Sequence, residues 1–390
     1  MPAMERPDLV AAARALAPIV REAADEADRE RRLPERVAQA MAKAGLYRTS
    51  VAIACGGYEC DPVTTIKVIE AIAEVDGATG WNLMIGLEGA GIASGAVSHM
   101  AAEEVFLGNP TSILCGAVNP LGRARAVEGG WIVSGRWPYA SGCHNANWFW
   151  GGATLIDDEG TPMKRPSGVP HAVQMLIPRA DWEILDTWNV AGLRGSGSHD
   201  VQVSDVFVPA HRMTDIFLPP TNDSPLFRYP VISRLCYNKV GVATGIARSA
   251  IDAFIELANE KTPYLSRSLL RDRAQAQLAV AEAEALLRSG RAFLFEAIGE
   301  MWDEVSAGRQ PSPELRVRQR LAASHAVVSA VKAVELVHNA AGATANFQSS
   351  PLERQFRDVH VVRAHVTVSP AFFETAGRAL LGVPVDPGSY

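Results

Sequence analysis

The sequence has few cysteines and no metal-binding signature. Its five cysteines, an odd number among 390 residues, lie at positions 55, 60, 115, 143 and 236. None of them forms a Cys-x-x-Cys pair, so neither a disulfide framework nor a structural zinc site is expected. The chain also contains no HExxH and no GxxxxGK(S/T) pattern, which leaves no support for a zinc protease or a P-loop nucleotide site. We predict no bound metal.

Long apolar runs and basic blocks are missing as well. No stretch of about 18 apolar residues occurs, so no membrane-spanning helix is expected. The first 20 residues include an early Glu and Asp and no long apolar segment, which argues against a signal peptide. The 37 Lys and Arg against 43 Asp and Glu give a net charge of −6, which argues against nucleic acid or an anionic membrane as the main partner. We therefore expect a cytoplasmic, multi-domain protein.

The chain does contain ample apolar sequence, 48% of its residues, and its periodicity changes along the length. Residues 1–111 have apolar positions three and four apart, which predicts a helical domain. Residues 112–228 contain alternating segments bounded by glycine and proline, which predict a β-barrel or β-sandwich domain. The predicted strands include 131–137, 172–178 and 201–209.

Residues 229–390 return to the helical period. Ser312, Pro313 and Glu314 form a capped helix start, and Asp61 followed by Pro62 forms another near the N-terminus. Four helices in the C-terminal part predict an up-and-down four-helix bundle. The predicted helices of this part are 237–259, 274–298, 313–340 and 370–381. Helices, then strands, then a bundle define an α+β fold with segregated elements.

Common catalytic motifs are absent or out of context. Gly192, Gly195 and Gly197 are spaced as in part of a dinucleotide-binding loop, but they do not lie between a strand and a helix of a βαβ unit. The segment 195–198, Gly-Ser-Gly-Ser, lacks the glycine spacing of a nucleophile elbow and is better explained as a turn. The C-terminal helices have no Glu-x-x-His pairs, which disfavours a di-iron site.

Two long segments resemble the acyl-CoA dehydrogenase superfamily. Residues 188–209, WNVAGLRGSGSHDVQVSDVFVP, are similar to the block that closes its β domain, and residues 340–365, AAGATANFQSSPLERQFRDVHVVRAH, to its last helix–loop–helix. The superfamily has the same order of a helical domain, a β domain and a four-helix bundle. The resemblance therefore implies an acyl-CoA dehydrogenase-like fold over nearly the whole chain.

The dehydrogenases of this superfamily use a glutamate to remove an α-proton, and the corresponding positions have no carboxylate here. One position is Ser349, and the alternative falls near Arg234, Leu235 and Cys236. An unaided serine, with a pKa far above 10, does not abstract an α-proton at neutral pH. Oxidation of an acyl thioester remains the alternative function, with its base relocated.

The segment 137–148, WPYASGCHNANW, instead resembles the two-component flavin-dependent monooxygenases of the same fold, as do Gly80-Trp81 and the spacing of His365 after Arg357-Asp358. This resemblance implies an oxygenase component that hydroxylates an aromatic or other small organic substrate. It implies O2 and reduced FMN or FAD from a separate flavin reductase, with a C4a-(hydro)peroxyflavin as the oxygenating species. Such a species needs a dry, enclosed site.

The resemblance also implies which residues bind the flavin. Trp81 lies where the related enzymes place an aromatic side chain against it, and Arg267 resembles the arginine that reaches its phosphate or ribityl chain. Arg271 and Arg273 are alternatives, and a solvated helix N-terminus is the plain structural explanation of all three. The predicted flavin-binding residues are Trp81, Tyr139, Ser141, Gly142, Arg267, Gly342, Ala343 and Thr344, with 342–346 contributed across a subunit interface.

Three residues are candidates for acid–base catalysis. His365 matches the active-site histidine of the related monooxygenases, and an ordinary imidazole pKa of about 6.5 suits either role at pH 7. The alternative for His365 is a packing residue buried by neighbouring valines. Glu88 is either a second polar group of the active site or a helix-surface carboxylate, and His144 is a further candidate. Residues 321–340 look apolar on more than one face, which together with the resemblance predicts a homotetramer.

Overall fold

The computed structural model describes residues 7–386, so the ends of the first and last predicted segments lie outside the described residues. The chain groups into two compact units, described separately below. Unit 1 comprises Asn82–Val190, Arg194–Phe227 and the described residues up to Cys60. Unit 2 comprises Asp61–Trp81, Ala191–Leu193 and the described residues from Arg228 onward. As independent domains, the three predicted segments 1–111, 112–228 and 229–390 stay a prediction.

Of the elements within residues 7–386, unit 1 contains short helices and all the strands. Its helices are α1 (Leu9–Ala15), α2 (Ala17–Glu30), α3 (Glu35–Lys43) and α6 (His99–Ala102), with a π-helical turn at Glu103–Leu107. Helix α5 (Gly77–Ala93) begins in unit 2 and continues into unit 1, and α7 (Pro225–Arg228) lies at the end of unit 1. Gly45 follows α3 in the left-handed conformation that ends a helix.

Seven strands form one mixed sheet in the order β5-β6-β2-β1-β3-β4-β7. The strands are β1 (Leu114–Val127), β2 (Gly130–Trp137), β3 (Trp148–Ile156), β4 (Ala172–Pro178), β5 (Glu183–Leu185), β6 (Asp200–Pro209) and β7 (Met213–Thr214). Only β1 and β3 pair in parallel, with Leu114 opposite Trp148. The three strands predicted from the alternating pattern are confirmed as β2, β4 and β6.

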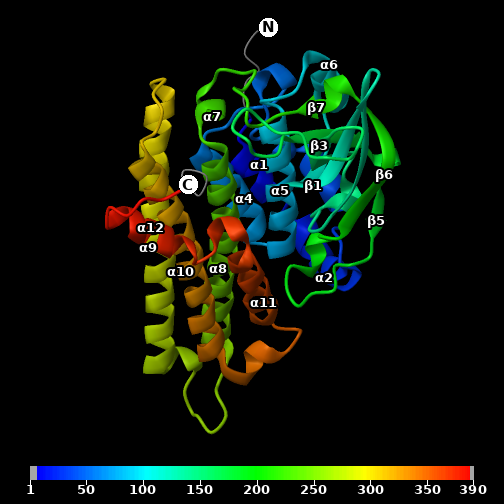
Figure 1. Ribbon diagram of the computed structural model, residues 1–390. Helices are drawn as coiled ribbons and strands as arrows, with labels where there is room; N and C mark the ends of the chain where they lie inside the picture. The colour runs from blue at the N-terminus through cyan, green and yellow to red at the C-terminus, as the bar shows by residue number, and fades with distance from the viewer. Residues whose placement is uncertain (1–6, 387–390) are drawn as a thin grey trace. The chain divides into compact units, whose positions relative to one another are not determined.

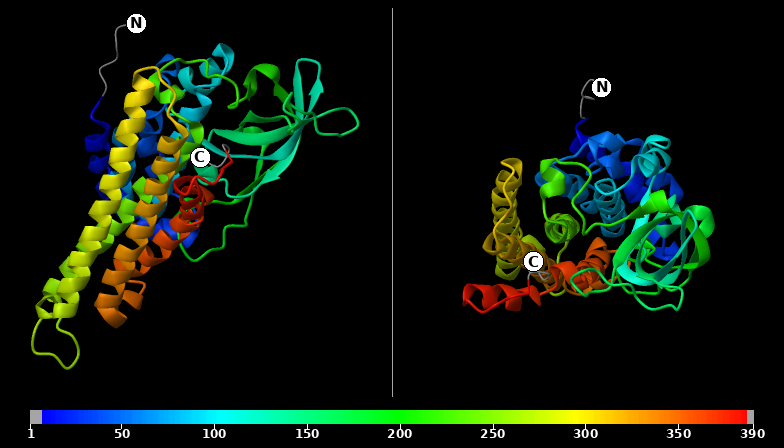
Figure 2. Two further views of the ribbon diagram at one scale, coloured as in Figure 1. Left: turned by 60° about the vertical axis from the view of Figure 1, so that its left-hand side comes forward. Right: turned by 45° about the horizontal axis from the view of Figure 1, so that its top comes forward.

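The core of the sheet is built from large side chains that the strand period places on one face. Trp137 of β2 meets Phe149 of β3 edge-on at a ring distance of 5.1 Å, and its indole N–H donates to the Gly152 carbonyl at 2.7 Å. Both residues are fully buried with Met175 and Val201. The sheet curves strongly (Figure 2, right). Its buried side chains form one hydrophobic cluster, and the loops discussed below extend from these strands.

Unit 2 is helical. Its elements are α4 (Pro62–Ala73), α8 (Val231–Glu260), α9 (Ala274–Ser306), α10 (Pro313–Ala341), α11 (Pro351–Ala364) and α12 (Phe372–Leu380). Figures 1 and 2 show α8, α9, α10 and α11 running alternately up and down beside one another. The predicted bundle is confirmed, but its fourth member is α11, because the predicted helix 370–381 is the nine-residue α12.

Local sequence accounts for the helix starts of unit 2. The Asp61 carboxylate accepts the Thr64 N–H at the start of α4, and the Ser312 hydroxyl accepts the Leu315 N–H at the start of α10. Helices α4 and α8 approach closely because Gly245 has no side chain; a Cβ there would lie 2.6 Å from that of Ala73. Both predicted caps are confirmed.

A buried ion pair joins α4 to α9. Arg291 donates two hydrogen bonds to Glu70, at 2.8 and 2.9 Å, and the Thr244 hydroxyl donates to the same carboxylate at 2.8 Å. Within residues 7–386, one helical stretch, Pro313–Asn346, is long and apolar enough by composition to span a membrane, a feature that sequence inspection did not predict. About 61% of its most apolar window is buried inside the structure, as in a core helix.

Candidate functional site

Two loops of unit 1 carry the sequence motifs, and the fold joins them. The loop after β2 and the loop before β6 are linked by hydrogen bonds from the Ala140 N–H to the His199 carbonyl and from the Gly142 N–H to the Ser196 carbonyl, both 3.0 Å. The Cys143 thiol donates to the Gly197 carbonyl at 3.4 Å. Segments that were recognised separately in the sequence therefore form one structure.

Three buried serines connect the loops through their side chains. The hydroxyl of Ser198 lies 2.6 Å from that of Ser141 and 2.7 Å from that of Ser196. Each hydroxyl has one proton, and two of the three protons are used within the chain. Ser141 also has a further interaction, so the trio is part of a larger buried polar network that ties the two loops together.

Gly142 occupies a position where a side chain does not fit. Its φ of +77° is left-handed, and a Cβ there would lie 2.9 Å from the Asn82 Oδ1. Asn82 also donates to the Gly195 carbonyl at 3.1 Å, so α5 contacts both loops. Tyr139, with φ of +62° and 69% exposed, meets Trp188 edge-on at 6.3 Å. A left-handed tyrosine costs roughly 1–2 kcal/mol, a strain typical of functional loops.

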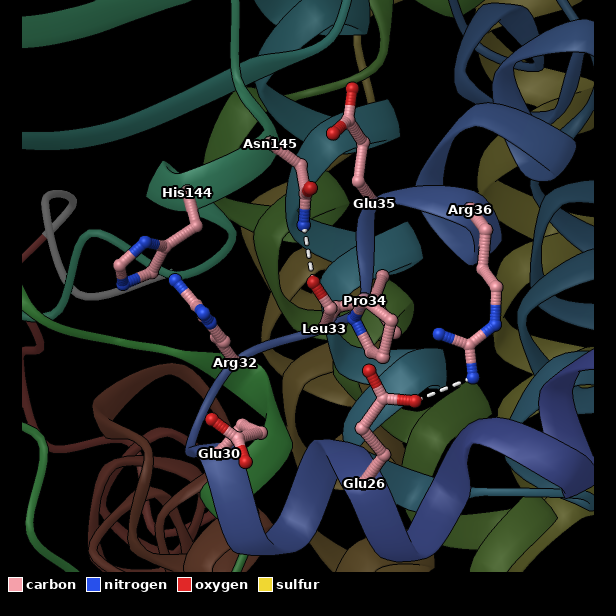
Figure 3. Close-up of a pocket in the computed structure, with 9 residues that line it drawn as sticks. All are labelled: Glu26, Glu30, Arg32, Leu33, Pro34, Glu35, Arg36, His144 and Asn145. Atoms are coloured by element: carbon pink, nitrogen blue, oxygen red, sulfur yellow. Dashed lines mark hydrogen bonds and ion pairs between the residues drawn. The ribbon is translucent and has the colours of Figure 1, made fainter.

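His144 lies at a pocket of about 450 Å³ in unit 1. Figure 3 shows its ring beside the Arg32 guanidinium, while Asn145 donates to the Leu33 carbonyl at 2.8 Å. The residues lining the pocket are Glu26, Glu30, Arg32, Leu33, Pro34, Glu35, Arg36, His144 and Asn145. Burial, followed by the neighbouring His199, lowers the pKa of His144 to about 4. His144 is therefore neutral at pH 7.

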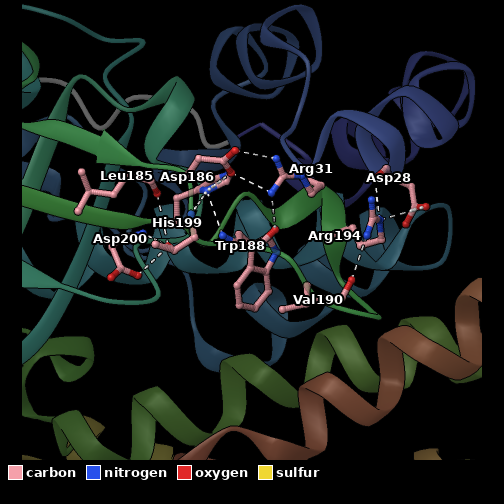
Figure 4. Close-up of polar contacts among 10 residues, drawn as sticks. Asp28, Arg31, Leu185, Asp186, Trp188, Val190, Arg194, His199 and Asp200 are labelled. Atoms are coloured by element: carbon pink, nitrogen blue, oxygen red, sulfur yellow. Dashed lines mark hydrogen bonds and ion pairs between the residues drawn. The ribbon is translucent and has the colours of Figure 1, made fainter.

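His199 is a site residue that sequence reasoning missed. Its Nδ1 accepts the backbone N–H groups of Thr187 and Trp188, both at 3.2 Å. Figure 4 shows Arg31 beside this network, donating to Asp186 at 2.9 Å and to the Trp188 carbonyl at 3.2 Å. The sequence feature that could have identified His199 is its position directly after Ser198, within the segment 188–209. Its two hydrogen bonds hold the turn that contains Thr187 and Trp188.

In unit 2, His365 lies beside Trp81. Their rings are 5.6 Å apart at 62°, an edge-on contact that places the predicted aromatic against the predicted histidine. Burial, together with the Lys239 cation, lowers the pKa of His365 to about 3. Of the valines expected to bury it, Val368 is buried but Val366 is 72% exposed. The expectation that Val366 covers His365 is wrong.

Lys239 is the second residue that sequence reasoning missed. It is 2% exposed in the N-terminal third of α8, where it acts electrostatically on His365. A lysine is almost never fully buried without a partner, and Lys239 has such an interaction. A single charged residue within residues 235–247 was the available signal. Its charge disfavours the protonated form of His365.

The two recognised segments also meet in unit 2. The Leu193 N–H donates to the buried Asp358 carboxylate at 2.5 Å, and Arg357 donates to the Ala191 carbonyl. A Cβ at Gly192 would lie 2.3 Å from the Arg357 carbonyl oxygen, so only glycine fits there. The Arg-Asp pair of α11 thus fixes residues 191–193, which lead into the serine loop.

The other predicted residues lie on several elements. Glu88 is 6% exposed within α5 and has interaction partners, so the surface-carboxylate alternative is wrong. Arg267 is exposed in the loop after α8. The Thr344 hydroxyl accepts from Lys261 at 2.7 Å in the turn Gly342–Asn346, where Ala343 is exposed and Gly342 has φ of +64°. Their roles toward a flavin stay a prediction.

Comparison with known proteins identifies the superfamily. Residues 7–105 match the family model described as acyl-CoA dehydrogenase, N-terminal domain, and residues 238–370 match acyl-CoA dehydrogenase, C-terminal domain. The chain is 32% identical to an indole-3-acetate monooxygenase of Pseudomonas putida, covering 93% of this chain and 91% of that protein. It is also 32% identical to the flavin-dependent monooxygenase oxygenase subunit HsaA of Rhodococcus jostii, covering 95% and 97%.

Solved structures agree. A 3-HSA hydroxylase from Rhodococcus superposes with a TM-score of 0.87 at 29% identity, covering 99% of this chain and 100% of that one. XiaF from Streptomyces, solved with FADH2 and glycerol, gives 0.89 at 25%, covering 97% and 96%. The fold and these matches define a flavin-dependent oxidoreductase with the acyl-CoA dehydrogenase fold. Within this superfamily the chain belongs to the flavin-dependent monooxygenases, as the sequence predicted.

The residues present fit a flavin in chemistry. An isoalloxazine has acceptors and donors along its edges and apolar faces. Taken by itself, unit 1 has the serine hydroxyls and a loop backbone that Gly142 leaves without a side chain. Taken by itself, unit 2 has the indole of Trp81 and a neutral imidazole. As flavin-binding residues, Ser141, Gly142 and Trp81 stay a prediction.

Proposed function

We propose that this chain is the oxygenase component of a two-component system that hydroxylates a small aromatic compound. The observation that carries the proposal is the neutral His365 packed edge-on against Trp81. The named relatives act on indole-3-acetate or are HsaA-type hydroxylases, which supports an aromatic substrate.

The absence of a carboxylate at the two expected base positions argues against the dehydrogenase alternative. Ser349 is exposed in the loop before α11, and Arg234 and Cys236 are buried on α8. A hydroxyl at Ser349 has no means to take an α-proton at neutral pH. Hydroxylation needs no such base, because one oxygen atom of O2 enters the substrate and the other leaves as water.

The chain's own residues have limited tasks in this reaction. Reduced flavin, when bound, supplies two electrons and the centre that activates oxygen. In unit 1, the serine trio and Gly142 would contact bound flavin. In unit 2, buried side chains around Trp81 would exclude water, which limits wasteful release of H2O2. His365 contributes a neutral imidazole held in one orientation.

The test uses purified protein with chemically reduced FMN or FAD, O2 and a panel of phenols and indole carboxylates. We expect 18O from 18O2 in the product of at least one aromatic substrate, with less H2O2 than in its absence. A matched reaction gives oxidised flavin, an acyl-CoA and an artificial electron acceptor. Enoyl-CoA formation without any aromatic oxygenation would contradict the proposal.

We further propose a cytoplasmic homotetramer. Unit 2 exposes large apolar side chains, most fully at Tyr264, Leu265 and Leu381, which supports burial in a subunit interface. All five cysteines are buried thiols, as expected in a reducing compartment. Sedimentation at micromolar concentration measures the assembly; a monomer there would contradict it.

A further inference from the structure

The Nδ1 atom of His365 has two hydrogen-bonding neighbours from one residue. The Thr367 hydroxyl oxygen lies 2.9 Å away, and the Thr367 backbone N–H donates to Nδ1 at 3.3 Å. A backbone N–H has no acceptor function, so Nδ1 accepts and carries no proton. With Nδ1 unprotonated, the Thr367 hydroxyl uses its one proton to donate to Nδ1, the nearer of its two acceptors.

A neutral imidazole without a proton on Nδ1 carries it on Nε2. The ring is neutral at pH 7 because burial, with the nearby Lys239 cation, disfavours the imidazolium form. The tautomer therefore follows from the hydrogen bonds, and the charge follows from the surroundings. The tautomer and the charge together mean that Nε2 of His365 presents an N–H donor and no lone pair.

The position of the ring is fixed from several sides. His365 is the last residue before the turn Val366–Val368, and its backbone N–H donates to the Val362 carbonyl of α11 at 3.1 Å. Trp81 packs edge-on against the ring. The Leu235 carbonyl of α8 lies 3.3 Å from the Thr367 hydroxyl and is the competing acceptor of its one proton.

We propose that Thr367 is a positioning residue that fixes His365 as the Nε2–H tautomer, so that His365 acts toward the bound reactants as a hydrogen-bond donor and not as a base. The assignment of the tautomer does not depend on the proposed function. Its consequence for hydroxylation rests on the proposed function. The sequence left His365 open as either an acid or a base, and this geometry disfavours the base. A proton lost by the substrate is then accepted by a group other than His365.

The first test reads the tautomer directly in the protein without substrate. Nitrogen NMR of protein labelled with 15N-histidine is expected to show Nδ1 of His365 as an unprotonated nitrogen and Nε2 as a protonated one at pH 7. The Thr367→Ser variant should preserve this pattern, since it keeps both donors. Thr367→Val removes the hydroxyl donor and should increase the share of the Nδ1–H form. A protonated Nδ1 in the parent protein would overturn the proposal.

The second test compares two amides that mimic opposite edges of the ring. The side-chain NH2 of glutamine in His365→Gln reaches close to the place of Nε2, and that of asparagine in His365→Asn reaches close to Nδ1. We expect His365→Gln to keep the ratio of product to H2O2 within about tenfold of the parent. His365→Asn should lose ~10²-fold or more, the range for removing one positioned donor.

Val366→Ala, at an exposed neighbouring side chain, controls for disturbance of the turn and should match the parent in both tests. Equal loss of coupling in the two amide variants, with reduced-flavin affinity retained, would overturn the donor role. If the parent protein hydroxylates nothing, the proposed function fails, while the NMR result still decides the tautomer.

Discussion

The carboxylate of Asp358 accepts the backbone N–H of Leu193 at 2.5 Å, although 165 residues of chain separate them. Asp358 is buried at the centre of α11. The contact joins the two segments whose likeness to the acyl-CoA dehydrogenase superfamily is most extensive. It explains why an Arg-Asp pair in one segment accompanies a glycine-rich turn in the other: the helix side chains hold the backbone of the turn.

Replacing Asp358 should therefore destabilise the protein. Asp358→Ala leaves the Leu193 N–H buried without its charged acceptor, and hydrogen bonds to charged groups contribute roughly 1.5–3 kcal/mol. Asp358→Asn keeps a neutral acceptor and should lose less. Urea denaturation measures both. The control is Asp252→Asn, in an exposed pair with Arg248, where the free energy of unfolding should change by less than about 0.5 kcal/mol. Equal losses of unfolding free energy at the two positions would refute a stabilising role of the Asp358 hydrogen bond.

Ser198→Ala should disconnect the serine trio. Ser198 is the middle hydroxyl, so its removal takes away a contact of both Ser141 and Ser196. Because the two loops lose their side-chain connection, we expect reduced-flavin affinity to fall about tenfold, which corresponds to about 1.4 kcal/mol. Equilibrium titration under anaerobic conditions measures it. Ser204→Ala, on the exposed side of β6, serves as the control, and an unchanged affinity in Ser198→Ala would show that the trio has only a structural role.

Local features of the fold were predictable from the sequence, because they depend on neighbouring residues. The Asp61 and Ser312 caps and the strand of Trp137 follow from residues within one or two turns. Helix α11 was not recognised by its periodicity, since only four of its fourteen residues are buried. Its resemblance to a known helix–loop–helix identified it instead.

The site was predictable only in part, because sequence patterns report neighbouring residues and not contacts between residues far apart in the chain. Trp81 and His365 were both named, yet nothing in the pattern indicated that their rings touch across 283 intervening positions, a contact that tertiary folding alone creates. Lys239 and His199 were missed because a buried lysine and a histidine in a turn look ordinary until their surroundings are known.

Gly142→Ala should be costlier than an alanine at another left-handed glycine. Gly142 and Gly168 have φ of +77° and +86°, but a Cβ meets the Asn82 Oδ1 at 2.9 Å only at Gly142, with nothing within 4 Å at Gly168. Gly168→Ala should cost about 1 kcal/mol from the backbone alone. Gly142→Ala should exceed that by about 1 kcal/mol or more and weaken flavin binding. Equal unfolding free energies would show that Asn82 moves freely.

The pKa values of His144, His199, His338 and His365 are all lowered, and the two largest shifts, at His144 and His365, predict how stability depends on pH. Burial lowers the pKa of His365 to about 3, with Lys239 contributing, and that of His144 to about 4, with His199 contributing. In the unfolded chain both titrate near 6.5, so between these values the unfolded state binds more protons. Stability is then full above about pH 6.5 and falls as the pH decreases toward 4 and 3.

Thermal unfolding from pH 8 to pH 4 tests this sign. The melting temperature should decline below about pH 6.5, and His365→Gln should decline less steeply because one of the two titrating groups is gone. His325→Gln, at a histidine on α10 outside both sites, is the matched control and should follow the parent curve. A melting temperature that rises as the pH falls from 6.5 to 5 would contradict the buried, neutral state of both imidazoles, and with it the donor role of His365.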